Sequence, residues 1–316
     1  MRTLTGTTSK AIADALQAER RDSGAVTFGL VLTLIAVVTS DRPDAGDAVA
    51  IAACRAGMTH PCRVIVVQPG DADAPARLDA EVSVGGEWGP GELVRLHLAG
   101  AALEHADTVV LPLLAPDTPV VTWWAGPPPA KPADEPLGLL ASRRITDTYL
   151  ADDPRASLLE RAAQYQPGDT DLAWTRDTLW RSMIASVYDA LPGPTRSLRL
   201  TTEHGNPSAA LLAAWLQRRT GRDVDIVDGP GPAITEIEVV AAAEPDGTGR
   251  DVVAVLVRPD GATATLQRTD QPNRVLPLPI RPIEDLLAEE LQRLDPDPVY
   301  AEALLTVGSV SEGRTA

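Results

Sequence analysis

The first half of the chain alternates between strand-like and helix-like patterns of apolar residues. The longest apolar run is FGLVLTLIAVV at residues 28–38. An alanine-rich helix is predicted over residues 43–58 and a β-branched strand over residues 63–68. This strand–helix–strand order favours parallel pairing in a sheet that is covered on both faces.

A second pattern indicates antiparallel strands in the same half. Apolar and polar residues alternate over residues 78–84 and 92–98, on either side of the glycine-rich GGEWGPG at residues 85–91. A phosphate cradle needs a helix after its glycines, and here a strand follows, so we interpret the segment as a hairpin. Residues 119–124 predict a further strand, which is followed by a proline-rich loop. The sheet is therefore expected to be mixed and mostly parallel.

The pattern changes at about residue 169, where a long amphipathic helix is predicted. Trp180, Ile184 and Val187 lie on one stripe of this helix at three- and four-residue spacing. Trp174 lies off that stripe, near Thr178 and Arg181, so the helix is expected to meet two different neighbours. The stripe itself is expected to be core.

The second half repeats an α/β pattern with a smaller core. A strand, a helix over residues 207–220 and another strand precede a meander, and two helices over residues 282–294 and 299–307 close the chain. The sequence therefore predicts a two-domain α/β protein, in which flanking helices cover a mixed sheet in the first domain and a meander plus helices form the second. The predicted domains are residues 1–168 and 169–308, followed by a disordered tail at residues 309–316.

Composition narrows the partners and the compartment. The 316 residues are 44% hydrophobic, enough to bury the cores of two domains. A net charge of −16 disfavours nucleic acid and anionic membrane surfaces as partners. The run at residues 28–38 falls short of the ~20 apolar residues that span a bilayer, and it starts too far into the chain for a secretory signal. With only two cysteines, we expect a cytoplasmic protein.

Two short segments hold four of the six tryptophans. They are TPVVTWW at residues 118–124, and DLAWTR at residues 171–176 with the following Trp180-Arg181. Together with RRITDTYL from Arg143, these motifs make the chain resemble the OpcA family of glucose-6-phosphate dehydrogenase assembly proteins, from about residue 60 to about residue 305. The resemblance implies a non-enzymatic cytoplasmic partner that promotes assembly and activity of the dehydrogenase that opens the oxidative pentose phosphate pathway.

Candidate recognition residues gather around the same tryptophans. Adjacent residues on a strand point to opposite faces, so one of the rings of Trp123 and Trp124 is expected to reach a partner unless both faces are covered there. Asp147 and Thr148 follow a neighbouring strand and are predicted to line one crevice together with Asp171 and Trp174, a crevice that seats a partner loop or a sugar phosphate. Core packing remains the commoner role for any one tryptophan. The candidates are Trp123, Trp124, Asp147, Thr148, Asp171, Trp174, Arg176 and Arg181.

Catalytic and metal-binding signatures are missing from the sequence. Cys54 and Cys62 flank His60, but paired ligands at zinc spacing are not present, so two buried thiols are favoured over a metal site or a disulfide. No nucleophile turn accompanies a histidine, and no G-x-G-x-x-G motif occurs. We therefore expect no cofactor and no metal. A sugar-phosphate-binding regulator and an enzyme acting on a small anionic metabolite are the alternatives.

Overall fold

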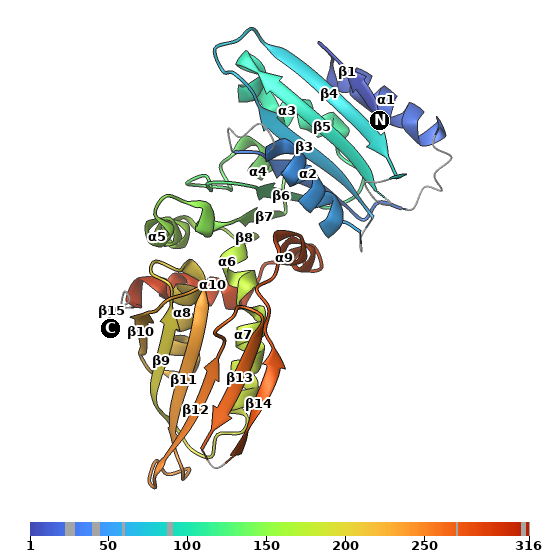
Figure 1. Ribbon diagram of the computed structural model, residues 1–316. Coiled ribbons are helices and arrows are strands. Elements are labelled where there is room, and N and C mark those ends of the chain that lie inside the picture. Colours follow the sequence, from blue (N-terminus) through green and yellow to red (C-terminus); the bar gives the residue numbers. More distant parts are fainter. Residues whose placement is uncertain are drawn as a thin grey trace. The chain divides into compact units, whose positions relative to one another are not determined.

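The computed structural model divides the chain into two compact α/β units, which confirms the predicted fold class (Figure 1). The structure describes residues 1–22, 29–39, 45–58, 61–86, 91–269, 271–310 and 314–315. The N-terminal unit comprises residues 1–150, 166–172 and 282–296, and the C-terminal unit comprises residues 151–165, 173–281 and 297–316. The units therefore interleave along the chain, whereas the predicted single boundary between residues 168 and 169 stays a prediction.

An eight-stranded sheet forms the centre of the N-terminal unit. Its strand order is β1-β4-β5-β3-β2-β6-β7-β8. The strand β4 is antiparallel to both β1 and β5, and its pairing with β5 confirms the predicted hairpin, although residues 87–90 of the turn lie outside the described residues. The strands are β1 (Arg2–Leu4), β2 (Leu32–Val37), β3 (Cys62–Pro69), β4 (Arg77–Val84), β5 (Glu92–Ala99), β6 (Val120–Trp124), β7 (Arg143–Thr146) and β8 (Asp169–Asp171).

Six strands of this sheet are parallel and follow the order β5-β3-β2-β6-β7-β8. Numbered by their place in the chain, they read 3-2-1-4-5-6, the order of doubly wound dinucleotide-binding sheets. The order reverses between β2 and β6, and ligands of such sheets bind outside the carboxyl ends of the strands at that point.

Helices cover both faces of the parallel strands, which explains why β2 and β3 are buried along almost their whole length. One face packs on α1 (Ser9–Asp22), for which the Thr8 hydroxyl accepts a hydrogen bond from Ala11 N at 3.3 Å. The other face packs on α2 (Ala45–Ala56) and α9 (Ile283–Glu290). Three short helical segments follow β5, namely η2 (Gly100–His105), α3 (Ala106–Val110) and η3 (Leu111–Leu113), and α4 (Pro136–Leu139) and η4 (Thr148–Leu150) come later in the chain.

The long helix predicted from residue 169 is wrong in its first part. Asp169–Asp171 instead forms β8, paired in parallel with β7. The preceding Gly168 has a φ of +96°, and a Cβ there would lie 2.4 Å from the carbonyl oxygen of Ser142, so its backbone can pass the neighbouring strand only as glycine. The helical part is split into α6 (Leu172–Arg176) and α7 (Thr178–Tyr188), with Asp177 between them at non-helical φ and ψ of −89° and 0°.

A seven-stranded sheet forms the centre of the C-terminal unit. Its order is β14-β13-β12-β11-β9-β10-β15, antiparallel except at β9–β10 and β10–β15. One face packs on α8, which connects the parallel strands β9 and β10. The strands are β9 (Thr195–Thr202), β10 (Val224–Asp228), β11 (Ile234–Ala242), β12 (Asp251–Val257), β13 (Thr263–Arg268), β14 (Gln271–Pro277) and β15 (Arg314–Thr315); the remaining helices are α5 (Pro154–Gln164), α8 (Pro207–Thr220) and α10 (Pro298–Thr306).

The end of the chain is ordered at its described positions. Ser309 completes η5 (Val307–Ser309), Val310 is buried, and Arg314–Thr315 pairs with β10. Residues 311–313 and 316 lie outside the described residues, and there the predicted disorder stays a prediction. No helix among the described residues is long and apolar enough to cross a membrane.

Candidate functional site

Trp123 and Trp124 occupy opposite faces of β6, and both rings are buried. Their exposed fractions are 3% and 4%. Trp123 belongs to the core under α2 and α9, whereas the ring of Trp124 lies 3.2 Å from the position of a Cβ on Gly138. The indole N–H of Trp123 has no hydrogen-bond partner among the described atoms. Both faces of the sheet are therefore covered here, and neither ring offers a surface to a partner in this structure.

Asp147, Thr148 and Asp171 come together at the carboxyl ends of β7 and β8. Asp171 is fully buried and accepts hydrogen bonds from Thr148 N at 3.1 Å and from Thr148 Oγ1 at 3.0 Å. The hydroxyl of Thr146 donates to the same carboxylate at 2.6 Å. A buried carboxylate is stable only when its oxygens accept such bonds. Asp171 and Thr148 thus belong to a structural network at the strand ends, and the adjacent Asp147 is 1% exposed and accepts from Tyr149 N at 3.3 Å.

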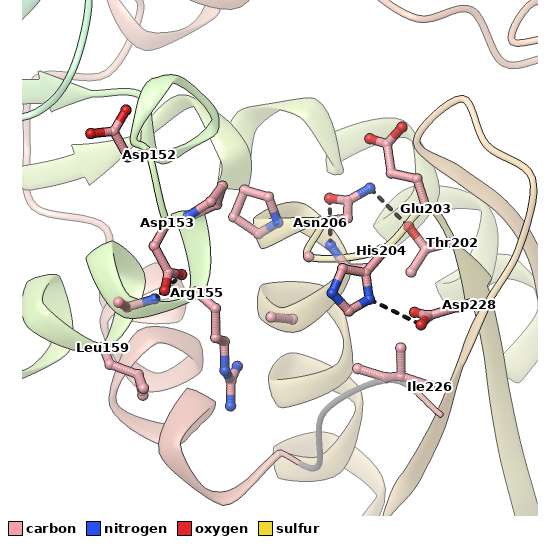
Figure 2. A pocket seen from close by; sticks show the side chains of 16 residues that line it. Asp152, Asp153, Arg155, Leu159, Thr202, Glu203, His204, Asn206, Ile226 and Asp228 are labelled. Atoms are coloured by element: carbon pink, nitrogen blue, oxygen red, sulfur yellow. Dashed lines mark hydrogen bonds and ion pairs between the residues drawn. The ribbon is translucent and has the colours of Figure 1, made fainter. Parts of the chain in front are cut away.

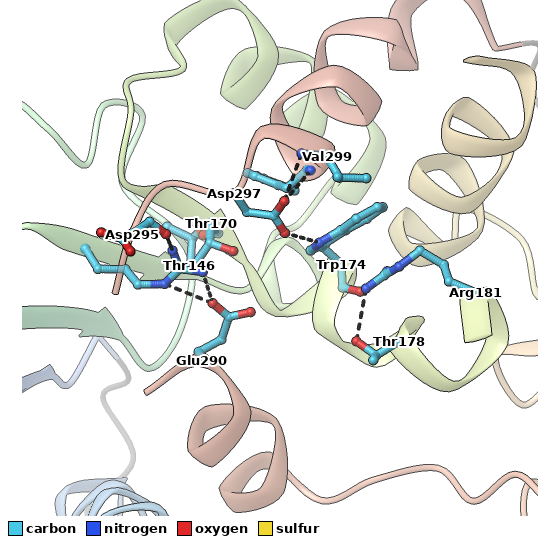
Figure 3. A network of polar contacts seen from close by, with 11 residues as sticks. Thr146, Thr170, Trp174, Thr178, Arg181, Glu290, Asp295, Asp297 and Val299 are labelled. Carbon is cyan, nitrogen blue, oxygen red and sulfur yellow. Dashed lines mark hydrogen bonds and ion pairs between the residues drawn. The ribbon is translucent and has the colours of Figure 1, made fainter. Parts of the chain in front are cut away.

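Trp174 and Arg181 lie together in the C-terminal unit, as the helical spacing predicted (Figure 3). The guanidinium of Arg181 stacks 3.5 Å from the ring centroid of Trp174 and donates to Thr178 Oγ1 at 3.0 Å. The indole N–H of Trp174 donates to Asp297 at 3.0 Å, and its ring packs on Tyr300. Trp174 is only 3% exposed, so it joins this core as fully as Trp180 does. Since Trp174 and Asp171 belong to different units, the crevice predicted to contain both stays a prediction.

Arg176 lies beside a buried carboxyl group. Asp177 is 1% exposed, and one of its carboxylate oxygens has no hydrogen-bond partner among the described atoms. Burial raises the pKa of the Asp177 carboxyl well above its usual range. Nearby guanidinium groups oppose this shift, because a positive charge favours the carboxylate: Arg181, Arg176, Arg258 and Arg281. Arg176 therefore acts within its own unit, where its charge favours the ionised form of the buried Asp177 carboxyl.

The strand order of the N-terminal unit implies a dinucleotide cofactor, but the residues at the switch point do not fit one. Such a site needs glycines between the first strand and the first helix, so that the backbone can approach the pyrophosphate. Between the end of β2 and residue 47 the chain reads VTSDRPDAG, with glycine only at position 46. Gly46 itself faces Gln68, whose side-chain oxygen lies 2.2 Å from the position of a Cβ. The chain's own amide therefore fills space at the start of α2.

The charge and packing around this point also oppose a phosphate. Asp47, in the first turn of α2, places a negative charge at the end of the helix that would otherwise attract an anion, and it pairs with Arg95. Across the switch point, Gly126 packs on Thr39, whose hydroxyl lies 1.9 Å from the position of a Cβ on Gly126. The ends of β2 and β6 are thus in close contact where a dinucleotide would cross the sheet.

A cavity of about 580 Å³ opens within the C-terminal unit (Figure 2). It lies at the carboxyl ends of the parallel strands β9 and β10, where α5 and α8 begin. Asn206 caps α8 by accepting from Ala209 N at 3.1 Å, and its amide donates to Thr202 Oγ1 at 2.9 Å. Asp153 caps α5 in the same way at 2.9 Å. Two helix N-termini therefore meet one cavity, whose lining is both polar and apolar.

The cavity wall carries groups of both charges. His204 Nδ1 lies 3.0 Å from Asp228 Oδ2, and Figure 2 shows this ring and Arg155 on facing walls. Arg155 donates to the carbonyl oxygens of Val307 and Val310 at 3.0 and 2.9 Å. No chemical motif in the sequence points to His204, whose side chain is 87% exposed. A signal for this pocket was present nonetheless, because His204 lies in a short loop between a strand and a capped helix.

Cys54 and Cys62 are free thiols buried in the core under α2. Burial raises the pKa of Cys54 to about 11 and that of Cys62 to about 12. Both therefore remain protonated at neutral pH. No group of three potential metal ligands occurs among the described residues, and His60 lies outside them.

Two protein-family models match this chain, one in each half. The model described as the glucose-6-phosphate dehydrogenase subunit N-terminal domain matches residues 53–163, and the model described as the C-terminal domain of that subunit matches residues 167–304. The chain belongs to the OpcA family of glucose-6-phosphate dehydrogenase assembly proteins. The division between the two OpcA family models falls close to β8, the last strand of the parallel sheet.

Individual relatives are more distant. The putative OxPP cycle protein OpcA of Synechocystis sp. (strain ATCC 27184 / PCC 6803 / Kazusa) is 26% identical over 182 residues, which are 51% of this chain and 37% of that protein. The match thus spans little more than a third of this OpcA relative.

Two solved structures also align with most of the chain. They are a 3-ketoreductase from Actinomadura kijaniata in complex with NADP (11% identity, TM-score 0.47, 90% of this chain and 98% of that one) and the glucose-6-phosphate 1-dehydrogenase of Mycobacterium avium (12%, 0.47, 90% and 94%).

Proposed function

We propose that this protein binds glucose-6-phosphate dehydrogenase in the cytoplasm and favours its active oligomer in the oxidative pentose phosphate pathway, without catalysing a reaction itself. The observation that supports this most strongly is the match of both OpcA family models, which together extend over most of the chain. The name of the Synechocystis relative supports the same pathway.

A non-catalytic role is supported by the chemistry of the switch point. In a doubly wound sheet this is where a dinucleotide supplies redox chemistry to the fold. Here Gln68 fills space at the start of α2, and Asp47 places a negative charge there. The protein would therefore act through binding energy alone.

The energy that such an activator must supply is small. A ligand shifts an equilibrium only by its difference in affinity for the two states. A tenfold shift of the dehydrogenase toward its active oligomer needs ~1.4 kcal/mol of preferential binding. An interface of ordinary size can supply that difference without new chemistry.

Initial-rate kinetics test this proposal. Dehydrogenase from the same organism is assayed with increasing concentrations of the chain, and the chain is also assayed alone. We expect saturable activation of the dehydrogenase and no NADP⁺ reduction by the chain alone. Unchanged kinetics at micromolar concentrations would refute the activator role, and turnover by the isolated chain would refute the non-catalytic role.

A metabolite-sensing role is the second candidate, and the cavity of the C-terminal unit favours it. Helix N-termini, His204 and Arg155 suit a phosphate group, whereas carboxylates such as Asp228 accept hydrogen bonds from hydroxyl groups. A hydroxylated, phosphorylated metabolite combines both features. Calorimetric titration with glucose 6-phosphate and, separately, with inorganic phosphate tests this role. Binding that is lost in His204→Ala would support it, and no heat at millimolar ligand would exclude it.

A further inference from the structure

The seven-stranded sheet of the C-terminal unit has one open face. Inward-pointing residues of its strands, such as Leu200, Val239 and Leu256, are 0–3% exposed and pack toward the helices. Figure 1 shows α7 and α8 on this side of the sheet. The outward-pointing residues alternate with the inward-pointing ones along the strands and stay half-buried or exposed, as at Arg199, Glu238 and Val255. We call the side that carries them the outer sheet face.

The outer sheet face does not have the composition of a face that only meets water. In an antiparallel sheet with one solvated face, polar outward residues alternate along each strand with apolar residues that face the core. On β12 the outward positions are Val253, Val255 and Val257, so the strand reads VVAVLV without alternation. The register places Val240 beside Val253, and it places Val257 in one row with Thr265 and Val275. Val275 is 71% exposed. Val240 and the β12 valines are half-buried neighbours, and contiguous apolar surface that stays partly exposed is typical of an interaction site.

The other half of the outer sheet face is acidic. In one row across the sheet, Asp225, Arg199 and Glu238 are neighbours, and Arg199 lies 3.5 Å from Asp225 and 3.9 Å from Glu238. Glu236 occupies the next row. One arginine against three carboxylates leaves this half net negative. An apolar centre beside a charged margin is the usual anatomy of a protein interface.

The size of the outer sheet face is also that of an interface. Six strands at ~4.8 Å spacing and about seven residues at ~3.4 Å each give roughly 700 Å². A stable complex of standard size buries about 800 Å² on each partner. The outer sheet face alone therefore provides nearly a full interface.

We infer that the outer sheet face is the surface that binds the dehydrogenase, against an apolar patch flanked by lysine or arginine side chains. This inference rests on the proposed function for the identity of the partner. A second copy of this chain is a poorer occupant, because each copy carries a net charge of −16 and like-charged surfaces repel.

Affinity measurements on matched variants test the inference. Dehydrogenase is immobilised, and binding of the wild-type chain, of Val253→Lys/Val255→Lys and of Leu305→Lys is measured by interferometry. Leu305 is 63% exposed on α10 of the same unit and serves as the control for an added lysine. We expect the double variant to bind at least 30-fold more weakly and the control to bind within twofold of wild type, because central apolar contacts dominate interface energies.

A second pair of substitutions tests the acidic half. Glu236→Lys/Glu238→Lys should lower the association rate severalfold and reverse its dependence on salt, since charges at a margin act mainly on encounter. Thermal melts of every variant establish that it is folded. Should the valine double variant not fold, Val255→Thr keeps the β-branched shape and should still weaken binding severalfold.

The outcomes separate this inference from the proposed function. A weak complex still forms at a protein concentration of about 10 μM. Failure of the wild-type chain to bind the dehydrogenase at that concentration would refute the proposed function itself. Wild-type binding that both folded valine variants retain would overturn the outer sheet face while leaving the proposed function intact. A chain whose own oligomer dissociates in the valine variants would instead assign the face to self-association.

Discussion

The two sheets of this protein differ in how their faces are covered. The parallel strands of the N-terminal unit have helices on both sides, and β2 and β3 are buried along almost their whole length. The sheet of the C-terminal unit buries one face, and β11 alternates buried and half-buried residues over most of its length. Parallel sheets need both faces covered, whereas antiparallel sheets can leave one face free.

This difference indicates where binding energy is available. In the N-terminal unit, tryptophans and carboxylates that look like recognition residues in the sequence are already used internally, as with Trp123, Trp124 and Asp171. In the C-terminal unit, valines on β12 remain partly exposed. The tryptophans and buried carboxylates therefore stabilise the fold, whereas the valines form the surface that is free to bind.

The largest expected difference in stability is between a lysine introduced into the covered sheet and a lysine introduced on the outer sheet face. Ile35→Lys places a charge on β2 at a position that is 0% exposed and has no acidic neighbour in register. An unpaired buried charge should cost more than about 4 kcal/mol, enough to leave the unit unfolded. Val255→Lys on the outer sheet face should cost about 1 kcal/mol or less, because the ammonium remains in water. Urea denaturation measures both, and equal losses would contradict the comparison.

Large effects are also expected from the buried tryptophans of the C-terminal unit. Trp174→Ala and Trp180→Ala should each lower the free energy of unfolding by ~3–5 kcal/mol, because both leave a cavity in a core. Trp174→Phe is the milder control. It should cost about 1 kcal/mol, the usual value of one hydrogen bond, since it removes the donor to Asp297 but keeps most of the ring. A melting temperature of Trp174→Ala close to that of wild type would show that the ring is a surface residue after all.

Much of the fold follows from periodicity along the chain. Continuous apolar runs predicted the covered strands, and the stripe of Trp180, Ile184 and Val187 is the buried side of α7. The helix predicted from residue 169 failed because a three-residue strand carries no period. The strand β8 forms because of long-range contacts: Gly168 fits against Ser142, and Asp169 pairs with Arg144.

The candidate residues were harder to predict than the fold. Trp174, Thr178 and Arg181 are neighbours, as helical spacing indicated. The burial of Trp174, however, depends on Tyr300 of α10 and on Asp297, which caps that helix, and both lie more than a hundred residues away in the chain. Equally, only the register of the strands shows that Val240, Val253 and Val257 share a face. Both the burial of the tryptophan and the grouping of the valines depend on residues far apart in the chain, so neither can be predicted from the sequence of one segment.

A smaller effect, dependent on pH, is expected from the core of the N-terminal unit. Folded Cys54 and Cys62 have pKa values of about 11 and about 12, whereas an unfolded thiol titrates near ~8.5. The folded state therefore keeps protons that the unfolded state loses. Above pH ~8.5 each thiol should lower the free energy of unfolding by up to ~1.4 kcal/mol per pH unit, until its folded pKa is reached.

The cysteine double variant isolates this effect. Cys54→Ala/Cys62→Ala should lose stability less steeply than wild type between pH 9 and 11, as measured by urea denaturation at each pH. Below pH 8 the two slopes should agree. Identical slopes throughout, or rapid alkylation of the native thiols at pH 8, would show that the thiols are accessible.

The smallest expected effect is at the switch point of the parallel sheet. Calorimetric titration with NADP⁺ up to 1 mM should give no binding heat, since a Kd above that concentration corresponds to less than ~4 kcal/mol of binding energy. Gln68→Gly removes the amide beside Gly46 and tests whether that side chain alone excludes the dinucleotide. Saturable binding by the wild-type chain would mean that the covered sheet is a ligand site and would reverse the comparison.

The central claim is that this chain works by joining the dehydrogenase, and the mass of the mixture tests it most directly. Multi-angle light scattering after size exclusion is carried out on the chain, on the dehydrogenase and on both together at micromolar concentrations. The account predicts a new species that is heavier than the dehydrogenase alone and contains both chains. Two peaks with the masses of the separate proteins, at every ratio, would contradict it.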